Sequence, residues 1–199
     1  MSALLVGFDL DMTLIDSRPG IKAVYDELAR QTGVPIDSQL VVSRLGPPLE
    51  SEMANWFPAD RIDEMSDRYR GLYAELALPL IGPLPGAVEA IDAVRESGRA
   101  IVITAKNVIH ARSHVTSFGF DPHDVFGGAW REGKAEVLRA EGATIYVGDH
   151  VHDMDAATAA GITGVGVSTG PSPARALIEH GATEVLTSLE QFPGWLSAR

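Results

Sequence analysis

Residues 3–13 read ALLVGFDLDMT, and this stretch carries both a structural and a chemical signal. Residues 3–8 are a short apolar run, which is typical of a strand that is buried on both faces of a parallel sheet. Asp9, Asp11 and Thr13 follow the run directly. Open α/β sheets bind their ligands at the carboxyl ends of their strands. The stretch therefore predicts a central strand with a polar site at its end.

Three further apolar runs have the same character, at residues 100–103 (AIVI), 144–147 (TIYV) and 165–167 (VGV). The spacing of apolar residues predicts helices over 87–96, 109–118, 134–140 and 154–160, and a glycine lies close behind each of them. From residue 82 onward, helices and strands therefore alternate. This alternation predicts an α/β fold with a doubly wound parallel sheet.

Residues 15–81 interrupt the alternation, because they contain no convincing strand. Helical patterns cover 21–32 and 62–78, and the turn at Pro47 and Pro48 can open a further helix at Leu49. A Pro/Gly-rich return follows at residues 79–86. We expect a helical insertion over residues 15–81, with residues 1–14 and 82–199 forming the core.

The composition excludes several classes of protein. The chain has 199 residues and no cysteine, which rules out disulfide scaffolds, thiol catalysis, Cys-ligated zinc and iron–sulfur clusters. Its net charge of −11 makes it a poor binder of nucleic acid, because it repels phosphates. No apolar run approaches the roughly 18–20 residues of a membrane span, and the first residues lack the features of a signal peptide. We expect a soluble protein of a cytoplasm-like compartment.

Asp9 and Asp11 leave their strand on the same side, so both carboxylates can face one site. Like charges at this distance repel unless a cation or a proton lies between them, and hard carboxylate oxygens suit Mg²⁺. The alternative is a loop that uses Asp and Thr for turns and helix caps.

Other strand ends add further polar groups. Thr104 and the backbone N–H of Ala105 follow the second run, where they can bind an anion or cap a helix. Lys134 lies at the start of a helix, where the helix dipole disfavours a cation. Its ammonium group is therefore expected either to serve the site or to lie in solvent. Asp149 and Asp153 follow the run 144–147, where they can face the first acid pair or serve a turn and a helix start. Together, these residues suit a phosphoryl group held by Mg²⁺ beside a carboxylate nucleophile.

The ordered set Asp9-x-Asp11-x-Thr13, Thr104, Lys134 and Gly148-Asp149-x-x-x-Asp153 resembles the haloacid dehalogenase-like (HAD) superfamily. The strings FDLDMTLIDS, LPGAVEAIDAVRESG and VGDHVHDMDAATAAG are similar to its phosphoglycolate phosphatase branch. The resemblance implies a Rossmann-like core and a small helical cap inserted after the first strand.

The resemblance also implies roles for these residues. Asp9 would attack phosphorus and form an aspartyl-phosphate, while Asp11 would protonate the leaving oxygen and then activate water. Mg²⁺ would be held by the Asp9 side chain, the Asp11 backbone carbonyl, Asp149 and Asp153. The phosphoryl oxygens would be held by Thr104, Ala105 and Lys134.

The expected function is hydrolysis of a small phosphorylated metabolite, because Asp11 stands where the dehalogenases of the superfamily lack an acid. A phosphomutase with the same core residues, and a non-catalytic binding or regulatory protein, remain as alternatives. Phosphoglycolate, a nucleoside monophosphate, pyrophosphate and a sugar phosphate all remain open as substrates, as does the oligomeric state. Two positions depart from the family pattern. Ala105 stands where the family often has Asn or Ser, and Ala135 stands where Pro often follows the lysine.

The cap is expected to select the substrate. Arg44 and Gly46 belong to a loop that can close over the site, and arginine suits a carboxylate or a phosphate. The alternative for Arg44 is a surface arginine before a turn. Four histidines are expected on helix or loop surfaces: His110, His114, His123 and His180.

Overall fold

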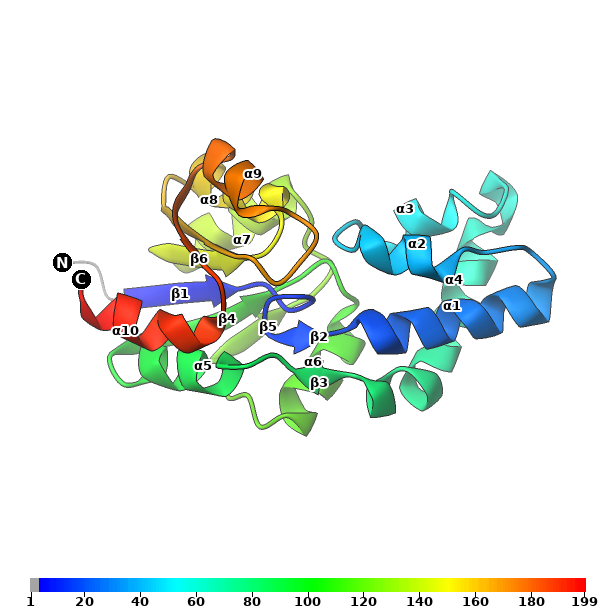
Figure 1. Ribbon diagram of the computed structural model, residues 1–199, viewed down its shortest axis with the longest axis horizontal. Coiled ribbons are helices and arrows are strands. Elements are labelled where there is room, and N and C mark those ends of the chain that lie inside the picture. Colours follow the sequence, from blue (N-terminus) through cyan, green and yellow to red (C-terminus); the bar gives the residue numbers. More distant parts are fainter. Residues whose placement is uncertain (1–3) are drawn as a thin grey trace.

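The computed structural model describes residues 4–199, and a six-stranded parallel sheet forms its centre (Figure 1). Across the sheet, the strands are β5 (Asp124–Phe126), β4 (Gly98–Ile103), β1 (Leu4–Phe8), β6 (Ile145–Gly148), β7 (Thr163–Val167) and β8 (Ala182–Leu186). The strand order reverses its direction between β1 and β6, as in doubly wound sheets. The predicted fold class is therefore confirmed. The predicted start of the first strand at residue 3 lies outside the described residues.

Helices cover both faces of the sheet (Figure 1). One face is covered by α5 (Ala87–Arg95), α6 (Val108–Ser117) and α10 (Phe192–Ser197), and the other by α7 (Glu132–Glu141), α8 (Val151–Ala160) and α9 (Ala174–Glu179). The alternating side chains of the strands divide between two apolar cores. Phe8 and Val102 pack in one core, whereas Leu5 and Ile101 pack in the other. Burial on both faces explains why the central strands are continuous apolar runs.

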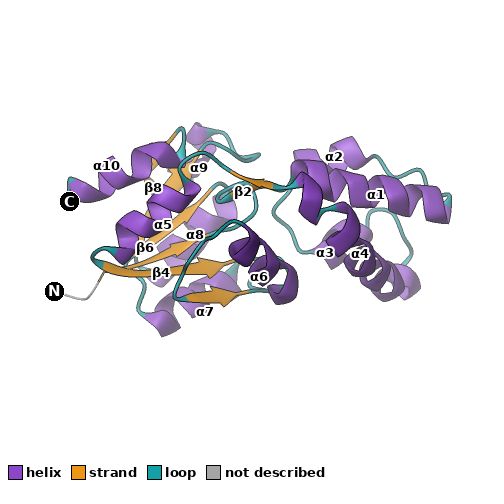
Figure 2. Cartoon of the chain, turned by 90° about the horizontal axis from the view of Figure 1, so that it is seen from below, coloured by secondary structure: helices purple, strands orange, loops and turns teal. Residues whose placement is uncertain are grey.

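Residues 18–80 are helical and gather beyond the carboxyl ends of the strands (Figures 1 and 2). The helices are α1 (Arg18–Thr32), α2 (Ser38–Ser43), α3 (Leu49–Met53) and α4 (Ile62–Leu76), with short 3₁₀ turns at Ala59–Arg61 and Leu78–Leu80. The chain enters and leaves this helical group through β2 (Ile15–Asp16) and β3 (Gly82–Pro83), which pair antiparallel.

Several boundaries differ from the sequence prediction. The prediction that residues 15–81 contain no strand was wrong at Ile15–Asp16, which form β2. The sequence prediction also missed β5 and β8 at the two edges of the sheet. Both are partly exposed, so they lack the continuous apolar run that marks the buried strands. Within residues 4–199, no helix combines the length and the apolar character needed to cross a membrane.

Candidate active site

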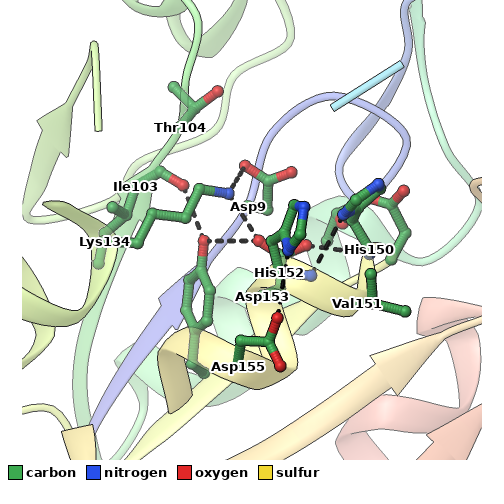
Figure 3. Close-up of polar contacts among 12 residues, drawn as sticks. Asp9, Ile103, Thr104, Lys134, His150, Val151, His152, Asp153 and Asp155 are labelled. Carbon is green, nitrogen blue, oxygen red and sulfur yellow. Dashed lines mark hydrogen bonds and ion pairs between the residues drawn. The ribbon is translucent and has the colours of Figure 1, made fainter. Parts of the chain in front are cut away.

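The polar residues predicted from the strand ends do come together. Asp9 follows β1, Thr104 follows β4, and Asp149 follows β6, and these three strands are neighbours at the centre of the sheet. Lys134 reaches the same point from the first turn of α7, and Asp153 reaches it from the first turn of α8 (Figure 3). All five side chains are buried. The topology therefore concentrates them at one edge, which faces the helical group.

A tight loop after β1 positions the first acid pair. The Asp9 amide donates to the carbonyl of Val147 at 2.9 Å, so Asp9 continues the strand ladder. Met12 has a left-handed φ of 62°, and its amide donates to the Ile15 carbonyl at 2.8 Å. The Thr13 hydroxyl donates to Asp149 Oδ1 at 2.8 Å, which ties this loop to the end of β6.

Lys134 is the cation at the centre of the carboxylates (Figure 3). Its Nζ donates to Asp9 Oδ1 at 2.9 Å and to Asp153 Oδ1 at 2.6 Å. Burial works against its charge, but the fields of Asp153 and Asp9 outweigh burial and raise the pKa of Lys134 well above its ordinary value. A single ammonium group therefore holds two of the buried acids, and Lys134 is not the solvated surface lysine of the alternative interpretation.

Asp9, Asp149 and Asp153 fit a divalent metal. Each offers a carboxylate oxygen, and these oxygens lie within 4.8 Å of one another. Burial, opposed by Lys134, raises the pKa of Asp9 to about 7. Burial and the neighbouring Asp153 and Asp9 also raise the pKa of Asp149 well above its ordinary value. The cluster thus has more negative charge than Lys134 alone compensates, and hard oxygen donors of this kind suit a divalent cation.

Asp153 has other partners as well. Its Oδ2 accepts from the backbone N–H of His150 at 3.0 Å, and the His150 side chain caps α8 in return. Gly148 is required here, because a β-carbon at that position would collide with the Asp153 side chain. The capping bonds thus fix Asp153 at the bottom of the site.

Thr104 and Ala105 line the cavity at the end of β4. The Thr104 hydroxyl accepts from the Lys106 backbone N–H at 3.1 Å, and the cap of α6 is Asn107, whose side chain accepts from the Ile109 amide. Thr104 is therefore not the cap of the helix that follows it.

Lys106 belongs to the site, although the sequence prediction did not include it. Its Nζ lies 3.0 Å from Asp11 Oδ1 and donates to the Tyr73 hydroxyl at 2.9 Å. Burial opposes its charge, but Asp11 and Tyr73 outweigh burial and raise the pKa of Lys106. Tyr73 lies on α4, so this lysine links Asp11 to the helical group. The only sequence signal for Lys106 is its place two residues after Thr104.

His114 also differs from its prediction. It is fully buried rather than on the surface, and its Nε2 lies 2.9 Å from the Tyr73 hydroxyl. The hydroxyl accepts from Lys106, so it has its own proton to donate to His114. Burial and the nearby charge of Lys106 lower the pKa of His114 to about 4, which keeps the imidazole neutral as an acceptor.

A cavity of about 270 Å³ lies between the carboxylates and the helical group. Arg44 and Gly46, which lie between α2 and α3, both line it. Arg44, however, already forms a two-pronged ion pair with Glu52, with Nε and Nη2 at 3.0 and 2.7 Å from the carboxylate oxygens. Gly46 has a φ of 140°, and a β-carbon there would press against the His150 ring at 3.0 Å. Gly46 thus allows the loop to approach the sheet edge closely.

Comparison with known proteins gives a consistent result. The haloacid dehalogenase-like hydrolase family model matches residues 6–158, and a second HAD-hydrolase-like model matches residues 128–192. Tyrosine-protein kinase PtkA of Mycobacterium tuberculosis is 30% identical, over 94% of this chain and 69% of the relative. The 5'-nucleotidase of Pseudomonas aeruginosa is 29% identical, over 92% of this chain and 90% of the relative. A phosphoglycolate phosphatase of Haemophilus influenzae is 25% identical, over 83% of this chain and 86% of the relative.

Solved structures share the fold. The crystal structure of a predicted phosphatase from Clostridium acetobutylicum superposes with a TM-score of 0.85 at 19% identity, and the match covers 99% of both chains. The agreement extends over the sheet and the helical group together.

Proposed function

Because the chain belongs to the haloacid dehalogenase-like hydrolase family, we propose that it is a Mg²⁺-dependent phosphatase of a small phosphorylated metabolite. The observation that carries this proposal is the buried cluster of Asp9, Asp149 and Asp153 around Lys134, at the strand ends and open to a cavity. Several relatives are named phosphatases or nucleotidases, which agrees with the proposal.

In the proposed mechanism, Asp9 is the nucleophile. Lys134 holds one oxygen of Asp9, and among residues 4–199 the other oxygen has no hydrogen bond. That oxygen attacks phosphorus and forms an aspartyl-phosphate, and the bond to the leaving alcohol oxygen breaks. Asp11 gives its proton to the leaving alcohol oxygen. It then takes a proton from the water that attacks the aspartyl-phosphate, and this attack releases phosphate and restores Asp9.

The other residues position the groups that react. Thr104, the Ala105 N–H and Lys134 are proposed to bind the phosphoryl oxygens. Asp9, the Asp11 backbone carbonyl, Asp149 and Asp153 are proposed to hold Mg²⁺. When bound, the metal would neutralise the charge of the phosphoryl group during transfer.

The helices of residues 15–81 are proposed to act as a cap that closes over the site and opens to release product. The antiparallel pairing of β2 and β3 supports this, because the two connections between the helical group and the sheet then lie side by side. Residues 4–14 and 82–199 would then be the rigid core.

Phosphate release from a panel of monoesters, with Mg²⁺ and with EDTA, tests the function. We expect release with Mg²⁺ and its loss in EDTA, with recovery when Mg²⁺ is restored. Free phosphate as the product separates a phosphatase from a phosphomutase, which would instead yield an isomeric sugar phosphate. Equal rates with and without metal would contradict the metal dependence. Failure to act on any ester would favour a non-catalytic role.

We predict that Tyr73→Phe slows the reaction mainly for poor leaving groups. The variant keeps the ring but removes the hydroxyl that holds Lys106 beside Asp11. We expect kcat/KM for an alkyl phosphate, which reports the transfer to Asp9 and not the later attack of water, to fall roughly five- to tenfold. A positioned acid supplies about 10²–10⁴-fold in all.

The matched control is p-nitrophenyl phosphate, whose leaving group needs no proton. Its kcat/KM should change less than twofold, whereas a general loss of structure would lower kcat/KM for both esters. An equal fall of kcat/KM for both esters would show that Tyr73 does not act through the proton that Asp11 gives to the leaving group.

A further inference from the structure

The arginines that line the cavity already have carboxylate partners. Arg44 pairs with Glu52, and Arg70 pairs with Glu50 and with Asp67, in the latter case at 3.0 Å. Glu52 is held firmly, because it also accepts from Trp56 Nε1 at 2.8 Å and only 12% of its side chain is exposed. The arginines are thus neutralised by acids of the same helical group.

The two lysines of the cavity are also engaged. Lys134 pairs with Asp9 and Asp153, and Lys106 pairs with Asp11. Every lysine and arginine that lines the cavity therefore has at least one carboxylate partner among residues 4–199. A second anionic group on a substrate would meet Glu50 and Glu52 together with the arginines, with no net positive charge to compensate its loss of hydration.

An aromatic wall lines the same cavity. The rings of Tyr25 and Tyr69 lie 5.1 Å apart, those of Tyr69 and Tyr73 lie 5.8 Å apart, and His110 stacks on Tyr73 at 4.3 Å. Among residues 4–199, the hydroxyl groups of Tyr25 and Tyr69 have no hydrogen-bond partner. The three tyrosines are buried against one another, so the wall is a packed aromatic surface with two hydroxyls for hydrogen bonds.

We propose that the preferred substrate is a phosphate monoester whose leaving group is an uncharged, hydroxyl-bearing ring, and that Glu50 and Glu52 disfavour leaving groups with a carboxylate. This inference rests on the phosphatase function proposed above. A ring would lie against the tyrosine wall while the phosphoryl group reaches Asp9. The cavity volume of about 270 Å³ suits one compact ring system, since it is near the lower end of the roughly 300–1,000 Å³ typical of ligand pockets.

The first test compares kcat/KM of the wild type for two esters of nearly equal size, phosphoglycolate and 2-hydroxyethyl phosphate. Phosphoglycolate carries a carboxylate where 2-hydroxyethyl phosphate carries a hydroxymethyl group. We expect phosphoglycolate to be at least about tenfold poorer, and a nucleoside 5'-monophosphate or a hexose 6-phosphate to exceed both. The faster of these two ring-bearing esters shows whether the preferred leaving group is a nucleoside or a sugar.

The second test changes one charge. Glu52→Gln should free Arg44 and raise the ratio of kcat/KM for phosphoglycolate over 2-hydroxyethyl phosphate about tenfold. The control is Glu64→Gln, which removes an exposed acid of α4 that pairs with Arg61 outside the cavity. Its ratio should equal that of the wild type.

The outcomes separate this inference from the function on which it rests. Phosphoglycolate as the best ester, or a ratio unchanged by Glu52→Gln, would overturn the inference and leave the phosphatase function intact. No phosphate release from any ester would overturn the function, and the inference with it. The wild-type comparison decides the question even if a variant fails to fold.

Discussion

Asp9→Asn is expected to abolish phosphate release, with kcat reduced by roughly 10⁴-fold or more, as when a nucleophile is removed from other enzymes with a covalent intermediate. The amide cannot attack phosphorus as the carboxylate does, so no aspartyl-phosphate forms. The measurement is initial phosphate release at saturating Mg²⁺ on the best ester of the panel. Activity close to that of the wild type would refute the covalent mechanism.

The same variant should fold at least as well as the wild type in EDTA. Burial raises the pKa of Asp9 from 3.8 to about 7, so the folded chain keeps a proton that the unfolded chain has lost between these pH values. The free energy of unfolding of the wild type therefore falls as the pH rises from about 4 to 7, and Asp9→Asn should lack this part of the fall.

A matched control for the loss of activity is Asp92→Asn on the exposed side of α5. Asp92 makes only a loose ion pair with Arg95, at 3.8 Å. We expect unchanged kcat and a change in stability within about 0.5 kcal/mol. If Asp92→Asn also lost activity, the loss in Asp9→Asn could not be assigned to removal of the nucleophile.

Lys134→Met is expected to lose both stability and activity. The variant keeps most of the side-chain volume but leaves Asp9 and Asp153 buried without their cation. Removal of one partner from a buried ion pair costs about 3–5 kcal/mol, and loss of a charge that holds the phosphoryl group costs roughly 10²–10³-fold in kcat. Chemical denaturation in EDTA and initial rates with Mg²⁺ measure the two effects.

The pH dependence identifies the cause of the lost stability. Burial raises the pKa of Asp9 to about 7, so at pH 5 its carboxyl group can take up a proton, which removes part of the uncompensated charge, whereas at pH 8 it does so less. The destabilisation by Lys134→Met should therefore be larger at pH 8 than at pH 5. A loss independent of pH would indicate a packing defect instead. Lys22→Met is the control, because Lys22 forms only an exposed pair with Asp26 on α1.

The sequence predicted the central part of the fold because burial on both faces leaves a clear pattern. The strands β1, β4, β6 and β7 are continuous apolar runs, and glycines lie close behind several of the helices between them. The start of α8 was predicted three residues late, at Met154 rather than Val151. Its first turn carries His152 and Asp153, and these polar side chains interrupt the apolar spacing where the helix begins.

The site was predictable only where it follows the sheet. Asp9, Thr104 and Asp149 each come directly after a central strand, so the topology alone brings them together. Lys106 and Tyr73 meet across 33 residues of sequence, through the packing of the helical group against the sheet edge. The pairing of Arg44 with Glu52 likewise depends on how α2 and α3 fold back on each other. No local spacing marks such contacts.

The pairing of β2 with β3 has an evolutionary consequence. Ile15 lies opposite Pro83 and Asp16 opposite Gly82, so the inserted segment starts and ends about one strand spacing apart, roughly 5 Å. A segment of different length or sequence whose ends meet at that spacing would leave β1 and β4 paired as they are. Natural selection can thus exchange the walls of the cavity while the carboxylates stay in place. Substrate preference is then free to diverge among descendants of one ancestor faster than the chemistry that they share.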